Sequence, residues 1–250
     1  MIKNERQSQI LEIIKSTKYA SVSKLAKLTY SSCPTIRRDL DYLSLNGYLT
    51  RTHGGAMDLA PSMIPPLDYR KEVAKEQKKL IGAKAASFIQ DGMVIFIDES
   101  VTASFIINKL PEFKNLTIIT NGLLATNLLS ELKLDFLCTG GEISGDCFIG
   151  SYAEKFIRGV NADICFFSTA SIFKDGTIAD NGKYESSLKK TMLDYSKRKI
   201  YLADDTKFNA HAIYNIASIE NIDYMITTIT EENFEQHADK IVIVPKNSSV

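Results

Sequence analysis

Apolar residues recur every three or four positions in three stretches of the first fifty residues, a spacing typical of helices that bury one face. The first stretch follows Asn4, a residue that can cap a helix, and the second follows Ser21 or Ser23. The third begins at Pro34, and proline is favoured at the first position of a helix because it has no N–H group to leave unpaired. The pattern predicts three short helices.

The third stretch has the order of parts of a helix that enters the DNA major groove with a wing beside it. Ser32 or Cys33 is the candidate cap. The predicted inward face carries Ile36, Leu40, Leu43 and Leu45. Gly47 predicts the end of the helix, residues 48–51 a short strand, and Gly54-Gly55 the turn of a wing. This segment therefore predicts a winged helix-turn-helix.

Beyond residue 68, apolar strands alternate with helical stretches. The first helix signal runs from about Asp68 to Ile89. Seven strands are predicted at 93–97, 116–120, 135–138, 164–167, 199–203, 224–228 and 241–244. Helices are predicted between them at 102–110, 123–131, 153–158 and 186–196. This alternation predicts an α/β domain with a mostly parallel sheet that is covered on both faces.

Polar loops follow four of these strands, at 98–102, 120–122, 139–142 and 204–207. Ligands of parallel sheets bind at the carboxyl ends of the strands, and a strand-to-helix turn offers unpaired N–H groups to an anion. The candidate ligand-binding residues are Asp98, Ser100, Thr102, Asn121, Glu142, Lys189 and Lys207. Hydroxyl groups and lysines suit a phosphate, and carboxylates and amides accept sugar hydroxyls. Alternatively, these residues cap helices, form turns or carry solvated charges.

Charge is distributed unevenly along the chain. Residues 1–60 carry nine Lys or Arg and five Asp or Glu, a net charge of +4, and the remainder carries −4. A basic terminal module on an acidic body favours nucleic-acid binding by the module alone, although ordinary variation in composition also produces charges of this size. The candidate DNA-binding residues are Ser32, Thr35, Arg37, Arg38, Tyr42, Arg51 and His53.

Arginine suits the first turns of a recognition helix because it pairs with guanine through two hydrogen bonds or clamps phosphate. Arg37 and Arg38 lie there, and Arg51 and His53 lie on the wing, within reach of the backbone or the minor groove. The alternative is that Arg37 or Arg38 pairs with Asp41 on an ordinary solvated face.

The remaining composition points to a cytoplasmic protein. The amino terminus lacks the apolar region of a secretory signal, and no apolar run reaches the ~18 residues of a membrane helix. The four cysteines are scattered without a C-x-x-C pair, which favours reduced, structural thiols. We expect no metal site, no cofactor and no membrane partner.

Residues 5–56 resemble the winged helix-turn-helix of the DeoR family of bacterial sugar-operon regulators. The resemblance rests on R-Q-S-Q-I-L, on T-I-R-R-D-L at 35–40 and on R-T-H-G-G-A at 51–56. Residues 72–230 resemble the family's effector domain, whose fold is similar to ribose-5-phosphate isomerase A. The motifs there are I-F-I-D, T-N-G, T-G-G-E at 139–142, Gly150, the Glu185 to Lys190 helix and L-A-D-D-T-K-F at 202–208.

The resemblance implies a repressor of a carbohydrate-metabolism operon that binds double-stranded operator DNA and a sugar phosphate, as a homo-oligomer, dimer or tetramer, at the nucleoid of a bacterial cytoplasm. It adds Gly140, Gly141 and Glu185 to the effector-binding residues. The implied domains are a DNA-binding domain at 1–56, a proline-containing linker at 57–71 and an effector and oligomerisation domain at 72–250.

Two loops depart from the family's pattern. The loop that usually reads like D-S-G-T-T is D-E-S-V-T here, and the Glu99 carboxylate repels a phosphate unless it points outward. The related isomerases place catalytic acids in the loop that is S-T-A-S-I-F at 168–173 here, where Ala170 and Phe173 replace them. Because an isomerase needs a positioned carboxylate, we expect a sensor and no catalytic residues. The alternatives are an isomerase-like enzyme with an appended DNA module, and a nonspecific nucleic-acid-binding or protein-interaction module.

Overall fold

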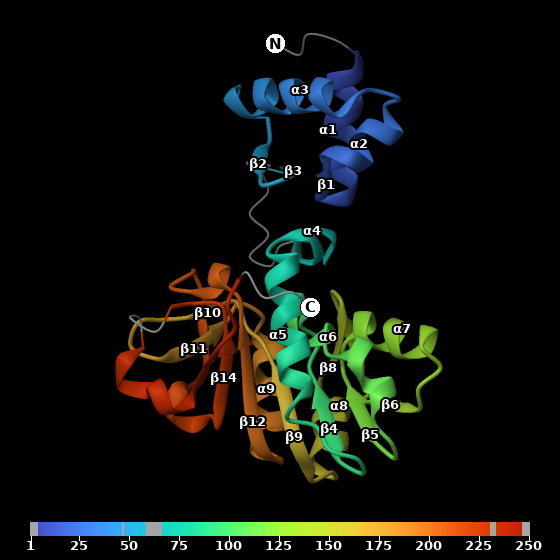
Figure 1. Cartoon of the computed structure of the whole chain (residues 1–250). Helices are drawn as coiled ribbons and strands as arrows, with labels where there is room; N and C mark the ends of the chain where they lie inside the picture. The colour runs from blue at the N-terminus through green and yellow to red at the C-terminus, as the bar shows by residue number, and fades with distance from the viewer. Residues whose placement is uncertain (1–4, 47, 59–66, 231–233, 247–250) are drawn as a thin grey trace. The chain divides into compact units, whose positions relative to one another are not determined.

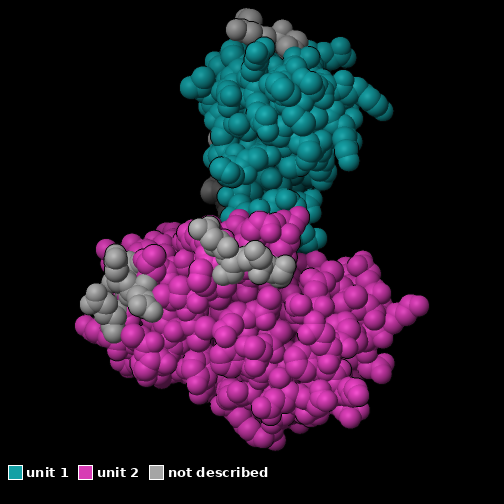
Figure 2. Space-filling view, in the orientation of Figure 1, with its two compact units in different colours: residues 1–73 teal, residues 74–250 magenta. Residues whose placement is uncertain are grey.

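The computed structural model describes residues 5–46, 48–58, 67–230 and 234–246 (Figure 1). The chain divides into two compact units, residues 1–73 and 74–250 (Figure 2). The predicted cap Asn4, the predicted helix end at Gly47 and most of the predicted linker lie outside the described residues. The functional domain boundaries stay a prediction.

The first unit contains the three predicted helices, the short helix α4 and a small antiparallel sheet. The helices are α1 (Glu5–Thr17), α2 (Val22–Leu28), α3 (Cys33–Leu45) and α4 (Leu67–Glu72). The strands are β1 (Tyr19–Ser21), β2 (Thr50–Thr52) and β3 (Gly55–Met57), in the order β1-β3-β2. The three helices share one core of buried side chains, which includes Ile10, Ile14, Leu25, Ile36, Leu40 and Leu43.

Leu45 is wrongly predicted to face this core, because its side chain is 88% exposed. At about 100° per residue, a position nine residues after Ile36 lies on the opposite side of the helix.

Strand β1 is absent from the prediction because three residues are too few for an alternating pattern to appear. It pairs with β3 closely enough that a Cβ on Gly55 would lie 2.3 Å from the carbonyl oxygen of Ala20. Glycine is therefore required at position 55.

The second unit is built on a seven-stranded sheet in the order β15-β14-β12-β9-β4-β5-β6, and every neighbouring pair is parallel. The strands are β4 (Val94–Ile97), β5 (Thr117–Thr120), β6 (Phe136–Cys138), β9 (Ala162–Phe167), β12 (Ser196–Ala203), β14 (Tyr224–Thr227) and β15 (Ile241–Ile243). Each of them corresponds to a predicted strand. The predicted α/β fold class is confirmed.

Helices cover both faces of this sheet (Figure 1). One face packs against α5 (Lys75–Ala86), α6 (Val101–Ser104), η1 (Ile107–Glu112) and α7 (Leu123–Glu131). The other face packs against α8 (Ser151–Arg158) and α9 (Lys183–Asp194). Three further 3-10 turns are η2 (Asp205–Lys207), η3 (Ile219–Asn221) and η5 (Glu235–Lys240). No helix within the described ranges has the length and apolar character needed to cross a membrane.

Two small sheets lie outside the prediction. Strands β7 (Glu142–Ser144) and β8 (Cys147–Ile149) form a hairpin. A three-stranded antiparallel sheet contains β10 (Ser171–Ile172), β11 (Thr177–Asp180) and β13 (Tyr214–Ser218). Their strands have two to five residues, so periodicity alone does not reveal them.

Two predicted helices are interrupted. The helix signal over 68–89 breaks at Ala74, whose φ of +50° is left-handed and ends the regular hydrogen bonding. Alanine is a strong helix former, so the sequence gives no warning of this break. The helix predicted over 102–110 divides into α6 and η1.

Candidate functional site

The amino end of α3 is a capped helix start. Ser32 is the cap, with extended backbone angles, and its Oγ accepts a hydrogen bond from the Thr35 N–H at 3.3 Å. The same Oγ lies 2.8 Å from the hydroxyl of Thr35. The next residue, Cys33, is the first residue of the helix, and Pro34 follows it in the first turn. Both hydroxyls that were predicted to face DNA thus also fix the helix start.

Arg37 and Arg38 are exposed, and among the described residues neither forms an ion pair. The neighbouring Asp39 points the other way, into the unit, and accepts hydrogen bonds from the Arg6 Nε at 2.6 Å and the Gln7 Nε2 at 3.0 Å. The two unpaired guanidinium groups therefore lie on the solvent-facing side of α3. On the opposite side, the buried Asp39 carboxylate joins α3 to α1. Such groups can clamp phosphates or pair with guanine.

The wing is fastened to α3 by Arg51. Its Nε donates to the Asp41 carboxylate at 2.9 Å, and its Nη1 donates to the carbonyl oxygen of Gly55 at 2.9 Å. The alternative pairing of Asp41 with Arg37 or Arg38 is therefore not formed. His53 is exposed at the tip of the wing. Arg51 has a structural role whether or not it also contacts DNA.

Two tyrosines of this unit differ in burial. Tyr42 is half-buried and packs against the core of the unit. Tyr30 occupies the turn between α2 and α3 with a left-handed φ of +49°, and its side chain is 98% exposed. Sequence reasoning passed over Tyr30, although a large aromatic residue in a polar turn is a signal that it could have used.

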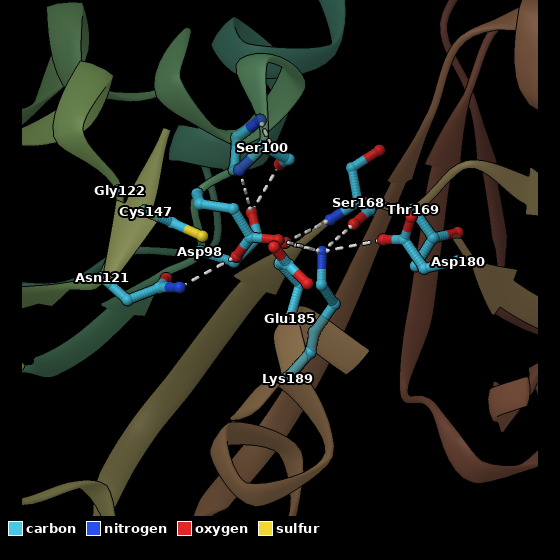
Figure 3. A network of polar contacts seen from close by, with 12 residues as sticks. Asp98, Ser100, Asn121, Gly122, Cys147, Ser168, Thr169, Asp180, Glu185 and Lys189 are labelled. Carbon is cyan, nitrogen blue, oxygen red and sulfur yellow. Dashed lines mark hydrogen bonds and ion pairs between the residues drawn. The ribbon is translucent and has the colours of Figure 1, made fainter. Parts of the chain in front are cut away.

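The second unit holds a buried lysine at the carboxyl end of its sheet (Figure 3). The side chain of Lys189, on α9, is 1% exposed. Its Nζ lies 2.8 Å from Asp98, 2.9 Å from Glu99 and 3.2 Å from Asp180, each measured to a carboxylate oxygen. It also donates to the carbonyl oxygen of Ser168 at 2.7 Å. We call these five residues the Lys189 network.

Asp98 anchors the network at the end of β4 and is fully buried. One of its oxygens accepts from the N–H and the hydroxyl of Ser100, and the other accepts from the Ser168 N–H at 3.1 Å. Burial raises the pKa of Asp98 to about 6, against the opposing effect of the Lys189 ammonium. Burial also opposes the charge on Lys189, but the carboxylates outweigh it and hold its pKa well above the ordinary value.

Glu99 points into the network. Its second oxygen accepts from the Asn121 Nδ2 at 3.1 Å, and the same Nδ2 donates to the carbonyl oxygen of Phe148 at 3.3 Å. Lys189 was predicted to neutralise a phosphate, and this geometry does not support that role because its ammonium already faces carboxylates. The sequence pattern presents Glu99 only as an obstacle to phosphate, whereas in the structure its carboxylate faces inward and is hydrogen-bonded.

The other predicted effector residues are dispersed around this edge. Ser100 caps α6, in which Thr102 is buried. Gly140 and Gly141 have φ values of +65° and +110°, and a Cβ on Gly141 would lie 2.4 Å from the Ile149 carbonyl oxygen. Glu142 is exposed at the start of β7.

Glu185 joins the region of the Lys189 network through α9 and accepts a hydrogen bond from the Ser144 hydroxyl at 3.0 Å (Figure 3). Lys207 lies on η2, and no ion pair involving it occurs in the part of the chain that the structure describes.

Sequence reasoning missed Ser168 and Asp180, because it predicted no strand β11 to carry Asp180. In the described ranges, no group of His, Cys, Asp and Glu side chains has the arrangement of a metal site.

Comparison with known families matches both units. A family model described as a DeoR-like helix-turn-helix domain matches residues 6–60, and one described as the DeoR C terminal sensor domain matches residues 73–228.

Curated proteins are similar to this chain over most of their length, among them two repressors and one activator. The HTH-type transcriptional repressor CsqR of Escherichia coli is 31% identical, covering 90% of this chain and 87% of that protein. The glycerol-3-phosphate regulon repressor of Escherichia coli is 31% identical and covers 91% of each. The L-fucose operon activator of Haemophilus influenzae is 30% identical, covering 88% and 89%. Among solved structures, ribose 5-phosphate isomerase A of Methanocaldococcus jannaschii aligns with 54% of this chain and 55% of its own, at 16% identity and a TM-score of 0.42.

Proposed function

The chain belongs to the DeoR family of transcriptional regulators, and from that premise we propose that it is a repressor of a carbohydrate-metabolism operon. In this proposal α3 and the wing bind operator DNA. A phosphorylated sugar binds the second unit at the carboxyl end of the seven-stranded sheet and releases the operator. The bound form is a dimer or tetramer, because a single winged helix seldom supplies operator affinity and paired half-sites are common.

The DNA-binding part of the proposal rests on the solvent-facing side of α3. Arg37 and Arg38 are exposed and unpaired in the described structure, while the helix beneath them is fixed by the Ser32 cap and by Asp39. A rigid helix that presents two free guanidinium groups in its first turns suits direct contact with bases and phosphates.

The test is a fluorescence-anisotropy titration of the full chain on DNA from upstream of its own gene. Arg37→Ala and Arg38→Ala are each expected to weaken specific binding by about 1–3 kcal/mol if they read bases. Arg158→Ala is the matched control, because it removes the same charge from a half-exposed position on α8 of the second unit. Wild-type affinity in both α3 variants would contradict the assignment of α3 as the recognition helix.

The effector part is tested in the same assay with a panel of sugar phosphates. Release of the operator by one compound at saturating concentration is expected. Retained operator affinity with every compound would count against this class of effector.

Isomerase activity is not expected, because Ala170 and Phe173 stand where the related enzymes place acids. Interconversion of an aldose phosphate and a ketose phosphate by the purified protein would favour the enzyme alternative instead.

A further inference from the structure

Glu99 occupies the loop that would hold an anion, and it points inward. Its two carboxylate oxygens are both engaged, one with the Lys189 ammonium at 2.9 Å and the other with the Asn121 amide at 3.1 Å. The side chains of Glu99 and Asp180 are 12% and 17% exposed, while that of Lys189 is 1% exposed. A ligand group that comes within reach of the Lys189 ammonium therefore also meets these carboxylates.

The orientation of Asn121 is fixed by its partners. Its Nδ2 donates to two acceptors, the Glu99 carboxylate and the Phe148 carbonyl oxygen, so the other amide atom must be the oxygen. Asn121 is 1% exposed, and its Oδ1 has no hydrogen-bond partner within the described residues. An unpaired buried acceptor is unfavourable until a donor reaches it.

The charges around Lys189 also disfavour an anion at this position. Three carboxylates, those of Asp98, Glu99 and Asp180, face the one ammonium of Lys189. Glu185 adds a further half-buried carboxylate nearby (Figure 3). A phosphate dianion placed here would meet excess negative charge in surroundings that screen it poorly. A hydroxyl or ammonium group would instead be attracted.

We propose that Glu99 is a specificity-determining residue that makes this end of the site select hydrogen-bond donors. It admits a hydroxyl or ammonium group of the effector and keeps phosphate out of the loop formed by residues 98–102. The inference rests on the proposed function only in taking the ligand of the Lys189 network to be the effector. A phosphorylated effector then places its hydroxyl-bearing end, and not its phosphate, beside Glu99 and Asn121.

Inorganic phosphate is the probe of this proposal, titrated into the full chain by isothermal calorimetry. Glu99→Gln keeps the size of the side chain and removes the charge, and Glu99→Ser introduces the small residue typical of the loop's pattern. Both variants are expected to bind phosphate at least tenfold more tightly than the wild type. Glu131→Gln, which removes one charge at an exposed position of α7, is expected to match the wild type.

One result would overturn the proposal: Glu99 variants that bind phosphate no more tightly than the wild type does. Operator binding is measured in parallel on the same preparations. Wild-type operator affinity in a Glu99 variant shows that its first unit is folded, and an unchanged urea denaturation midpoint shows the same for its second unit. Absence of specific operator binding by the wild type would count against the proposed function, while the phosphate titration would still decide the role of Glu99.

Discussion

Asp98 and Lys189 show how burial changes what a charged residue can do. Lys189 reads in the sequence as a ligand for an anion, yet its ammonium is surrounded by oxygen atoms of the protein. A lysine placed in this way joins the ends of β4, β9 and β11 and holds three carboxylates around its ammonium. Removing one partner of such a buried group leaves an uncompensated charge, which is strongly unfavourable.

The buried Asp98 gives the stability of the protein a pH dependence of defined sign. Its pKa is raised to about 6 in the folded chain, in an environment shared with Lys189, Glu99 and Asp180. Between the unfolded and folded pKa values the folded chain holds a proton that the unfolded chain releases, so this contribution to the free energy of unfolding rises as the pH falls. We expect a gain of about 1 kcal/mol between pH 7 and pH 5.

The measurement is urea denaturation of the wild type and of Asp98→Asn at both pH values. The difference in free energy of unfolding between the two proteins is expected to change by that amount in favour of the wild type at pH 5. A difference that is the same at both values would show that Asp98 does not take up the proton.

At the scale of elements, two side chains, Ser32 and Asp39, hold α3 in position. Ser32 satisfies an N–H group at the start of the helix, and Asp39 joins α3 to α1 through Arg6 and Gln7. The side of α3 that carries the arginines faces solvent because the opposite side is packed and hydrogen-bonded to the unit.

Loss of the cap is expected to destabilise the first unit. Ser32→Ala removes the acceptor for the Thr35 N–H and should lower the free energy of unfolding by about 1 kcal/mol. Ser32→Thr keeps a hydroxyl at the cap and should recover most of that loss. Chemical denaturation of the three proteins measures the effect, and equal stability of the Ala variant and the wild type would exclude a capping role.

Loss of Asp39 is expected to be more damaging. Asp39→Ala leaves the buried amide of Gln7 without this acceptor, and should lower the free energy of unfolding by about 1–3 kcal/mol. Glu12→Ala, at an exposed position of α1, is the matched control and should cost little. If both variants unfold alike, the contact between α1 and α3 does not contribute measurably.

A strand could be predicted from the sequence when its run of apolar residues was long enough to be recognised. The seven parallel strands were predicted because most of them are apolar runs buried on both faces, such as Cys165 to Phe167. Strands β1, β7, β8, β10, β11 and β13 were missed because they have two to five residues, too few for an alternating pattern to appear. The inward orientation of Glu99 could not be predicted, because it depends on Asn121 from one strand end and Lys189 from a distant helix.

At the scale of the whole molecule, the two units have complementary tasks under the proposed function. An effector can change DNA affinity only if it binds the DNA-competent and DNA-incompetent states with different affinities. The coupling free energy is then the same whichever ligand binds first.

This reciprocity is a quantitative prediction. If the effector weakens operator binding by a factor of about 5–150, the range usual for such coupling, operator DNA must weaken effector binding by the same factor. Calorimetric titration of the effector with and without saturating operator measures the second factor, and anisotropy measures the first. Two unequal factors would show that the titrations report on different species, for example different oligomers.

The exposed tyrosine in the turn before α3 also offers an optical route to these questions. The chain contains no tryptophan, so Tyr30→Trp would introduce a single indole whose emission reports on one place in the protein. At 98% exposure the ring should emit at the wavelength of a fully hydrated indole. Stopped-flow mixing with unlabelled operator would then follow association in real time, and the same signal would follow dissociation when the effector is added.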